Sequence, residues 1–173
     1  MIELGWFDRR RVELIDGRIL EMPPQKSEHE VAITLAAAVL PAAFGSAGHV
    51  RVQMALALGR RSDPEPDVAV VAGRARDYTR QKPAVALLVV EVALSSLAYD
   101  RGRKARLCAS AGVADYWIVN LVHRTLEVHR RPEPDGQRPF GHRFADVQTL
   151  GPTDNACPLA APQAKVAVAD LLP

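Results

Sequence analysis

A single acidic residue interrupts the most apolar segment of this chain. Residues 86–94 read Ala-Leu-Leu-Val-Val-Glu-Val-Ala-Leu, and the glutamate among them is Glu91. A continuous apolar run of this length is typical of a fully buried strand. A lone carboxylate in such a strand is costly to desolvate unless it is paired, protonated or bound to a cation. The fold must therefore bury this strand and also provide a partner for Glu91.

The order of the other segments predicts a mixed α/β (α+β) fold, in which helices pack against a sheet. Asp16-Gly17 lies between two short apolar stretches and favours the tight turn of a hairpin. Ser27 and Glu30 have the spacing of a helix capping box, and Pro41 is expected to end that helix at residue 40. The expected helices are 27–40 and 95–112; the expected strands are 12–15, 18–22, 50–58, 67–72, 86–94, 115–120 and 125–129, followed by a proline-rich loop at 132–139 and a final strand or turn at 165–172.

Length and composition narrow the class of protein. The 173 residues fit a single domain, 1–173, and a net charge of +2 is too small to demand a nucleic-acid partner by itself. The two cysteines form no CxxC pair, which argues against a disulfide scaffold or a structural zinc site. Residues 1–16 lack an apolar signal core, and Thr34 and Pro41 interrupt the apolar stretch 31–45. We therefore expect a cytoplasmic protein with no membrane partner.

A second acidic residue stands at the head of another apolar run, Asp67 before residues 68–71. If the strands 67–72 and 86–94 pair antiparallel, a register with Ala72 near Ala86 places Asp67 opposite Glu91. Their Cβ atoms would then lie about 5 Å apart on one face of the sheet. Two carboxylates at that distance repel each other unless a cation lies between them, and oxygen ligands favour Mg²⁺.

Helical periodicity decides where Lys104 points. At about 100° per residue, Lys104 falls on the apolar side of the helix 95–112, whereas Arg103 and Arg106 fall on the other side. An inward lysine needs an acidic partner, which a carboxylate and metal cluster would provide. The alternative is a pair between Asp100 and Lys104 at the edge of the helix, worth only a few tenths of a kcal/mol.

These residues lie in longer motifs that resemble a known family. The motifs are RVELIDGRILEMPP at 11–24, PEPD at 64–67, VVEVALSSLAYDRGRK at 89–104, AGVADYWIVN at 111–120 and VAVADLLP at 166–173. Together they resemble the Uma-type restriction endonuclease family of the PD-(D/E)XK nuclease superfamily. The resemblance covers nearly the whole chain.

The resemblance implies a restriction-endonuclease-like core, with a mixed, largely antiparallel central sheet flanked by helices and an N-terminal β-hairpin. It also implies an endonuclease that hydrolyses DNA phosphodiester bonds with Mg²⁺, for which Mn²⁺ could substitute, and without an organic cofactor. Asp67 and Glu91 would bind the metal, Lys104 would orient or activate the attacking water, and Glu13 would be a further acidic residue of the catalytic site. A homodimer is implied because cutting two strands needs two sites.

The chain departs from the pattern of the resembled proteins at three positions. The superfamily commonly places its lysine two residues after the second acid, where this chain has Ala93, and Lys104 fits a variant that uses a helix lysine. Leu94 stands where a polar residue is usual, and Cys108 replaces a usual tyrosine. These two changes support an alternative function, a catalytically impaired nuclease fold that binds nucleic acid or has a regulatory role.

Two further polar residues are weaker candidates. Gln53 lies in one of the expected strands, and His29 lies between two glutamates at the start of the first helix. For His29, a place in a capped helix start is a sufficient explanation. The basic connector 73–83 and Arg101 are candidates for phosphate contacts.

Overall fold

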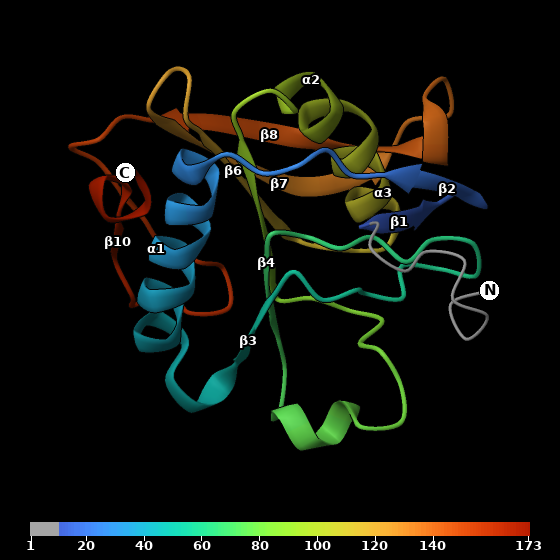
Figure 1. Ribbon diagram of the computed structural model, residues 1–173, viewed down its shortest axis with the longest axis horizontal. Coiled ribbons are helices and arrows are strands. Elements are labelled where there is room, and N and C mark those ends of the chain that lie inside the picture. Colours follow the sequence, from blue (N-terminus) through green and yellow to red (C-terminus); the bar gives the residue numbers. More distant parts are fainter. Residues whose placement is uncertain (1–10) are drawn as a thin grey trace.

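The computed structural model describes residues 11–173, and its central feature is a six-stranded sheet (Figure 1). The strand order is β3-β4-β5-β6-β7-β8, and every neighbouring pair is antiparallel except β5 and β6. The mixed, largely antiparallel sheet predicted from the sequence is therefore confirmed. The strands of the sheet are β3 (His49–Val52), β4 (Val68–Val71), β5 (Leu88–Ala93), β6 (Asp115–Asn120), β7 (Thr125–Pro134) and β8 (His142–Leu150).

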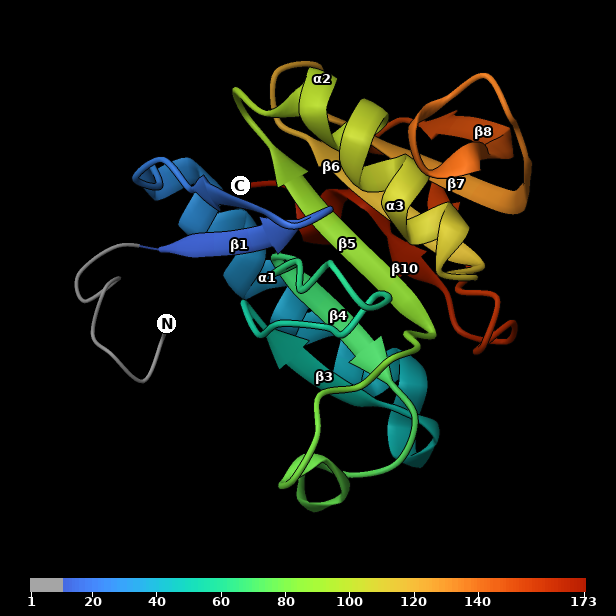
Figure 2. The same cartoon turned by 90° about the vertical axis from the view of Figure 1, so that its right-hand side faces the viewer.

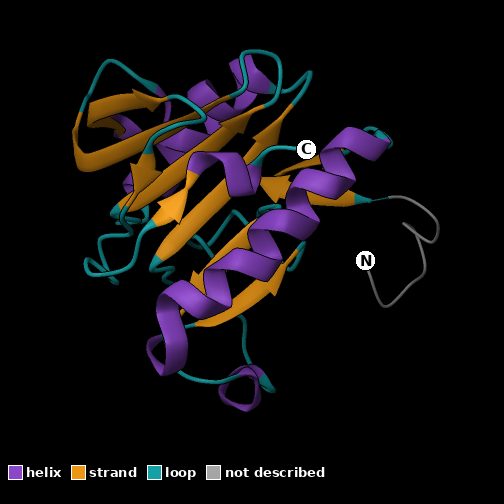
Figure 3. Ribbon diagram, turned by 90° about the vertical axis from the view of Figure 1, so that its left-hand side faces the viewer, coloured by secondary structure: helices purple, strands orange, loops and turns teal. Residues whose placement is uncertain are grey.

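Helices cover both faces of this sheet. Figure 2 shows α2 (Leu97–Tyr99) and α3 (Ala105–Ser110) in front of the strands and α1 (Ser27–Phe44) behind them, and Figure 3 shows α1 crossing the opposite face. Alternate residues of each strand supply the two cores, since successive side chains point to opposite faces. Val90 packs on the α1 side with Trp117, whereas Val89 packs on the α3 side with Tyr116. This alternation places Glu91 on the α3 side.

Helix α1 continues past Pro41 to Phe44, so the predicted end at residue 40 is wrong. Proline removes one backbone hydrogen bond, and here the helix closes one turn later, where the Gly45 N–H donates to the Pro41 carbonyl. The expected capping box is also absent, because Ser27 is the first helical residue rather than the cap. The residues of α1 that are buried against the sheet are Ala32, Ile33, Ala36, Leu40 and Phe44.

By length and composition alone, Ser27–Ala47 could cross a membrane, and no other helix among residues 11–173 could. One such helix is weak evidence for a membrane span, because core helices of the same length meet the same criterion. The inner face of α1 packs in the core on the sheet.

The second helical segment, 97–110, contains a π turn at Asp100–Lys104 between α2 and α3. The Ala105 N–H donates to the Asp100 carbonyl five residues earlier, which adds one residue to a turn of the helix. The segment ends near Gly112, whose φ of 77° is the left-handed conformation that glycine adopts at helix ends. The predicted helix is confirmed over 97–110 and is two residues shorter at each end than expected.

Outside the main sheet, β1 (Val12–Ile15) and β2 (Arg18–Glu21) form the predicted hairpin. Asp16 and Gly17 have φ values of 53° and 75°, as a tight two-residue turn requires. A bridge between Leu14 and Asp63 connects β1 to the rest of the chain. Near the other end of the chain, β9 (Asn155–Ala156) pairs with β10 (Val166–Ala167), and a short 3₁₀ helix spans Val168–Leu171.

One strand prediction and one loop prediction are wrong. The expected strand 50–58 ends at Val52, because Gln53 adopts a φ of 49° that interrupts an extended chain. The proline-rich stretch 132–139 is only partly a loop, since β7 runs to Pro134 and pairs there with β8, a strand that the sequence did not predict.

Candidate active site

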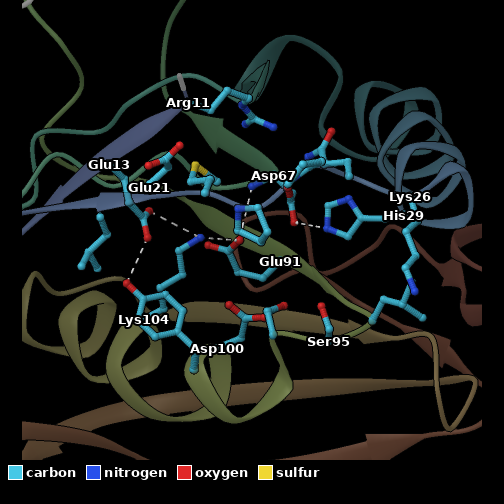
Figure 4. A pocket seen from close by; sticks show the side chains of 18 residues that line it. Arg11, Glu13, Glu21, Lys26, His29, Asp67, Glu91, Ser95, Asp100 and Lys104 are labelled. Atoms are coloured by element: carbon cyan, nitrogen blue, oxygen red, sulfur yellow. Dashed lines mark hydrogen bonds and ion pairs between the residues drawn. The ribbon is translucent and has the colours of Figure 1, made fainter. Parts of the chain in front are cut away.

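A cavity of about 390 Å³ lies where several chain segments meet above the sheet (Figure 4). The hairpin β1–β2 and the stretch 22–26 form one wall, and residues 94–104 form another. The start of α1 and the ends of β4 and β5 nearest the hairpin complete it. The candidate residues that line the cavity are Glu13, Asp67, Glu91 and Lys104, together with His29 and Asp100.

Asp67 and Glu91 are placed by the pairing of β4 and β5. Val68 pairs with Val90 in an antiparallel register, which continues to Asp67 opposite Glu91. The register predicted from the sequence is therefore confirmed. The Asp67 N–H donates to Glu91 Oε2 over 3.4 Å, and the Val92 N–H donates to Asp67 Oδ2 over 2.9 Å. Both carboxylates are buried, with 5% and 2% of the residue exposed.

Lys104 reaches the same cavity from the helical segment. Its ammonium Nζ lies 2.9 Å from Glu91 Oε2 and 3.7 Å from Glu13 Oε2. In Figure 4, Glu13 and Glu91 approach Lys104 from opposite sides. Only 5% of Lys104 is exposed, so the inward orientation predicted from helical periodicity is confirmed. The alternative pair between Asp100 and Lys104 is not among the ion pairs of residues 11–173.

Burial and neighbouring charges shift the pKa values of Lys104 and Glu91. Burial by itself would lower the pKa of the Lys104 ammonium, but the charges of Glu91 and Glu13 outweigh this effect and raise its pKa. Lys104 is therefore a cation at neutral pH. Burial raises the pKa of Glu91 well above its usual range; Lys104 opposes this shift, whereas the charge of Asp67 adds to it. The site thus disfavours a full set of ionised carboxylates.

Glu13 joins the hairpin wall to this cluster. It is a buried residue of β1, and its Oε1 accepts a hydrogen bond of 3.0 Å from the Tyr99 hydroxyl. Burial and the neighbouring charge of Glu13 raise the pKa of Tyr99, so the phenol stays protonated and donates. Glu13 therefore lies between Tyr99 and Lys104.

His29 is a member of the site that the sequence reasoning set aside. Its Nε2 lies 3.3 Å from Asp67 Oδ2, and its buried Nδ1 has no hydrogen-bond partner among residues 11–173. Burial would lower the pKa of His29, but the hydrogen bond to Asp67, the charge of Asp67 and smaller effects of Val92 and Asp100 together raise it. The sequence did hold a signal: His29 precedes the buried Ile33 by four residues, which places both on the inner face of α1.

The pKa of Asp67 is shifted in the opposite direction to that of Glu91. Burial would raise the pKa of Asp67, but the hydrogen bond from His29 and the charge of Lys104 lower it overall. Gln53, a weak candidate in the sequence, donates to Asp67 Oδ1 over 3.4 Å. The site therefore favours the ionised form of Asp67.

Asp100 is a further buried carboxylate at the cavity. Its Oδ2 accepts a hydrogen bond of 2.5 Å from the Ser96 hydroxyl. Burial raises the pKa of Asp100 to about 6, against the opposing effect of Lys104. Four buried carboxylates, those of Glu13, Asp67, Glu91 and Asp100, therefore influence the Lys104 ammonium.

The donor set suits a hard cation, although the protein would supply few of the ligands. Among residues 11–173, no three His, Cys, Asp or Glu side chains are grouped so as to hold a metal ion. Within the same residues, Glu91 Oε1 accepts no hydrogen bond, so one oxygen of this carboxylate is available. Mg²⁺ commonly binds one or two carboxylates and keeps several waters, so Asp67 and Glu91 fit this ion as a minimal pair of ligands.

The residues that were expected to contact phosphate either lie away from the carboxylate pair or already form hydrogen bonds to another residue. The connector 73–83 follows β4 and precedes β5, so it lies at the end of these strands opposite to Asp67 and Glu91. Arg101 lies on the helical segment but forms two hydrogen bonds of 2.7 Å with the buried Glu127. Neither group therefore lines the cavity that holds Lys104.

The positions that depart from the resembled pattern have clear places in the structure. Leu94 lines the cavity and gives part of its wall an apolar surface. Cys108 is buried in the core on the α3 side, and burial raises the pKa of its thiol, so it remains an apolar packing residue. Ala93 lies in the same core on that side of β5, and Lys104 approaches Glu91 from the helix instead.

Comparison with known proteins adds independent findings. A family model named Uma2 and described as "Putative restriction endonuclease" matches residues 6–156. Among solved structures, a putative nuclease belonging to DUF820 from Anabaena variabilis ATCC 29413 is similar, with a TM-score of 0.72 and 14% sequence identity. The likeness covers 92% of this chain and 88% of that chain. None of the curated proteins matches the sequence.

Proposed function

Since the chain belongs to the Uma2 family, described as "Putative restriction endonuclease", and has the fold of a nuclease, we propose that it is a DNA endonuclease that requires a divalent cation. The observation that carries this proposal is the Lys104 ammonium 2.9 Å from Glu91, with Asp67 opposite Glu91 in the strand register. An ammonium and two carboxylates at one cavity are the groups that metal-assisted phosphodiester hydrolysis needs.

Asp67 and Glu91 would hold Mg²⁺, or Mn²⁺ in its place. When bound, the cation would supply positive charge that lowers the pKa of an attacking water and neutralises charge on the phosphate. The pKa values of the two residues support this assignment. Asp67 has a lowered pKa and is ionised, whereas burial and the charge of Asp67 raise the pKa of Glu91, a repulsion that a cation would relieve.

Lys104 would donate a hydrogen bond to the attacking water or to a nonbridging phosphate oxygen. Burial strengthens this electrostatic effect because little water remains to screen the charge. Glu13 would act through Lys104 as a positioning residue, since it accepts from Tyr99 and lies 3.7 Å from the ammonium. His29 would hold Asp67 in orientation through its contact of 3.3 Å.

The cellular setting belongs to the same proposal. We expect a cytoplasmic homodimer that acts on DNA without an organic cofactor, because two strands are cut most directly by two copies of one site.

Cleavage assays with matched variants test this function. Supercoiled plasmid, linear duplex and RNA would be incubated with the protein in Mg²⁺, Mn²⁺ or EDTA. Asp67→Asn and Lys104→Ala are expected to abolish metal-dependent cutting. The controls are Asp170→Asn and Lys165→Ala, two exposed residues without an ion pair among residues 11–173, and they should cut like the unmodified protein. Cutting that persists in EDTA or in Lys104→Ala would contradict the proposed mechanism.

A second candidate function is a nuclease fold that binds nucleic acid without cutting it. The observation in its favour is Leu94, which presents an apolar side chain to the cavity where a polar one is usual. DNA binding without cleavage under every metal condition would favour this function. Recovery of cleavage in Leu94→Ser would then identify the residue responsible.

A further inference from the structure

A second cavity, of about 400 Å³, lies on the other side of the helical segment 97–110. It is bounded by α3, by β7 and β8, and by the loop that joins these two strands. Figure 2 shows α3 lying beside β7 and β8. It shares no lining residue with the first cavity. Its charged lining comprises four arginines and one aspartate, namely Arg101, Arg106, Arg138, Arg143 and Asp135.

Two of the arginines are held in place by glutamates of β7. Arg101 donates hydrogen bonds of 2.7 Å from Nε and Nη2 to the buried Glu127. Arg143 donates to Glu133, the residue opposite it in the ladder between β7 and β8. A guanidinium has five N–H donors, so each of these side chains keeps donors for another acceptor. The two positions are therefore fixed before any ligand arrives.

The other two arginines carry charge that the chain does not neutralise at hydrogen-bond distance. Among residues 11–173, Arg106 forms no ion pair or hydrogen bond, and it is only half-buried. The Nε of Arg138 lies 3.8 Å from Asp135 Oδ2, which is too long for a hydrogen bond. The same oxygen of Asp135 lies 3.9 Å from Arg143 Nε, so the lining offers one carboxylate to four guanidinium groups.

The rest of the cavity lining is apolar except for His129. Ala105, Phe144 and Val147 line it, and the Phe144 ring stacks on Tyr116 with 5.7 Å between the ring centroids. Val147 is 55% exposed although it is apolar. A ligand that pairs with the arginines would therefore also cover an apolar surface.

We propose that this second cavity binds a nucleotide through its phosphate. Guanidinium groups match phosphate oxygens with paired hydrogen bonds, and a phosphate supplies the acceptors that Arg106 and Arg138 lack. The volume falls in the range of small-ligand sites, which leaves room for a sugar or base against Phe144 and Val147. The nucleotide is either free in solution or part of a nucleic-acid strand, and both sources offer the same phosphate chemistry. The site does not depend on the proposed cleavage.

Binding measured in EDTA tests this site separately from catalysis. Deoxyadenosine monophosphate, deoxyadenosine and a short single-stranded oligonucleotide would be titrated into the protein by calorimetry, with the methyl NMR signals of Val147 as a local reporter. The double variant Arg106→Gln/Arg138→Gln is expected to weaken binding of the monophosphate by about tenfold or more, because it removes two charged donors. Arg80→Gln removes one charge from the exposed connector 73–83 and serves as the control.

The outcomes separate the two cavities and the two sources. Binding of the monophosphate that shifts Val147, survives in Glu91→Gln and is lost in the double variant supports the site. Whichever of monophosphate and oligonucleotide binds more tightly identifies the source. Equal binding of deoxyadenosine, an equal loss in Arg80→Gln, or a loss in Glu91→Gln as large as in the double variant would overturn the proposal. Failure of plasmid cleavage would bear on the proposed function alone.

Discussion

Replacement of Lys104 by methionine is expected to destabilise the metal-free protein strongly, whereas Glu91→Gln should have little effect. The side chains of Lys104, Glu91 and Glu13 are only 6%, 3% and 4% exposed. Removing one partner of a buried ion pair costs about 3–5 kcal/mol, because the other charge is left without compensation. Lys104→Met leaves the two buried carboxylates of Glu91 and Glu13 without their cation, so its loss of unfolding free energy should reach this range.

Glu91→Gln differs because the carboxylate it removes is disfavoured in the folded state. The pKa of Glu91 is raised by burial and by the charge of Asp67, so a neutral side chain of the same shape relieves repulsion. The amide oxygen can still accept from Lys104 and from the Asp67 N–H. We expect a change within about 1 kcal/mol of the unmodified protein. The double variant Lys104→Met/Glu91→Gln should be about 2 kcal/mol more stable than the sum of the two single changes in unfolding free energy predicts.

Urea unfolding in EDTA, followed by tryptophan fluorescence, measures these free energies, with the buried Trp117 contributing to the signal. Lys165→Met is the matched control, because this lysine is exposed and has no ion pair among residues 11–173. A Lys104→Met protein as stable as the control would show that the ammonium is not buried among the carboxylates. Equal losses in Lys104→Met and Glu91→Gln would refute the asymmetry between the two groups.

Three further predictions follow from the same site. The folded-state pKa of Asp100, about 6, lies above its usual value of 3.8. The stability that protonated Asp100 contributes is therefore complete below pH 3.8 and is lost as the pH rises to 6. Asp100→Asn should remove this decline, which is at most about 3 kcal/mol, from the free energy of unfolding measured by denaturation between pH 4 and 6. Mg²⁺ at ten times its dissociation constant should stabilise the protein by about 1.4 kcal/mol in thermal unfolding, and Asp67→Asn should abolish the gain. Tyr99→Phe removes the hydrogen bond to Glu13 and should lower the cleavage rate about tenfold without changing Mg²⁺ affinity, whereas an unchanged rate would remove Glu13 from the set of positioning residues.

The core of the candidate site followed from the sequence because two periodicities determine it. An antiparallel pair of apolar strands fixes which residues face each other, and this placed Asp67 opposite Glu91. Helical periodicity turned Lys104 inward, and the added residue of the π turn did not change that outcome. Both signals are strong because a buried strand and a buried helix face tolerate few polar residues.

The parts that the sequence did not predict lie where burial leaves a weaker pattern. β8 is an edge strand whose residues 146–149 are all exposed, so no alternation of polar and apolar residues marks it. Pro132 and Pro134 did not end β7, because they lie beyond the pairing with β6 and need no partner on that side. Gln53 ends β3 through its own backbone conformation, which no periodic pattern reveals.

The π turn at Asp100–Lys104 has a consequence for comparing this chain with its relatives. A π turn accommodates one extra residue within a single turn, so the residues on either side of it keep their relative orientation. A homologue that lacks this residue and forms a regular α-helix here would still direct its lysine at the residue equivalent to Glu91. An alignment with a one-residue gap between residues 97 and 105 is therefore compatible with an ammonium at the same position.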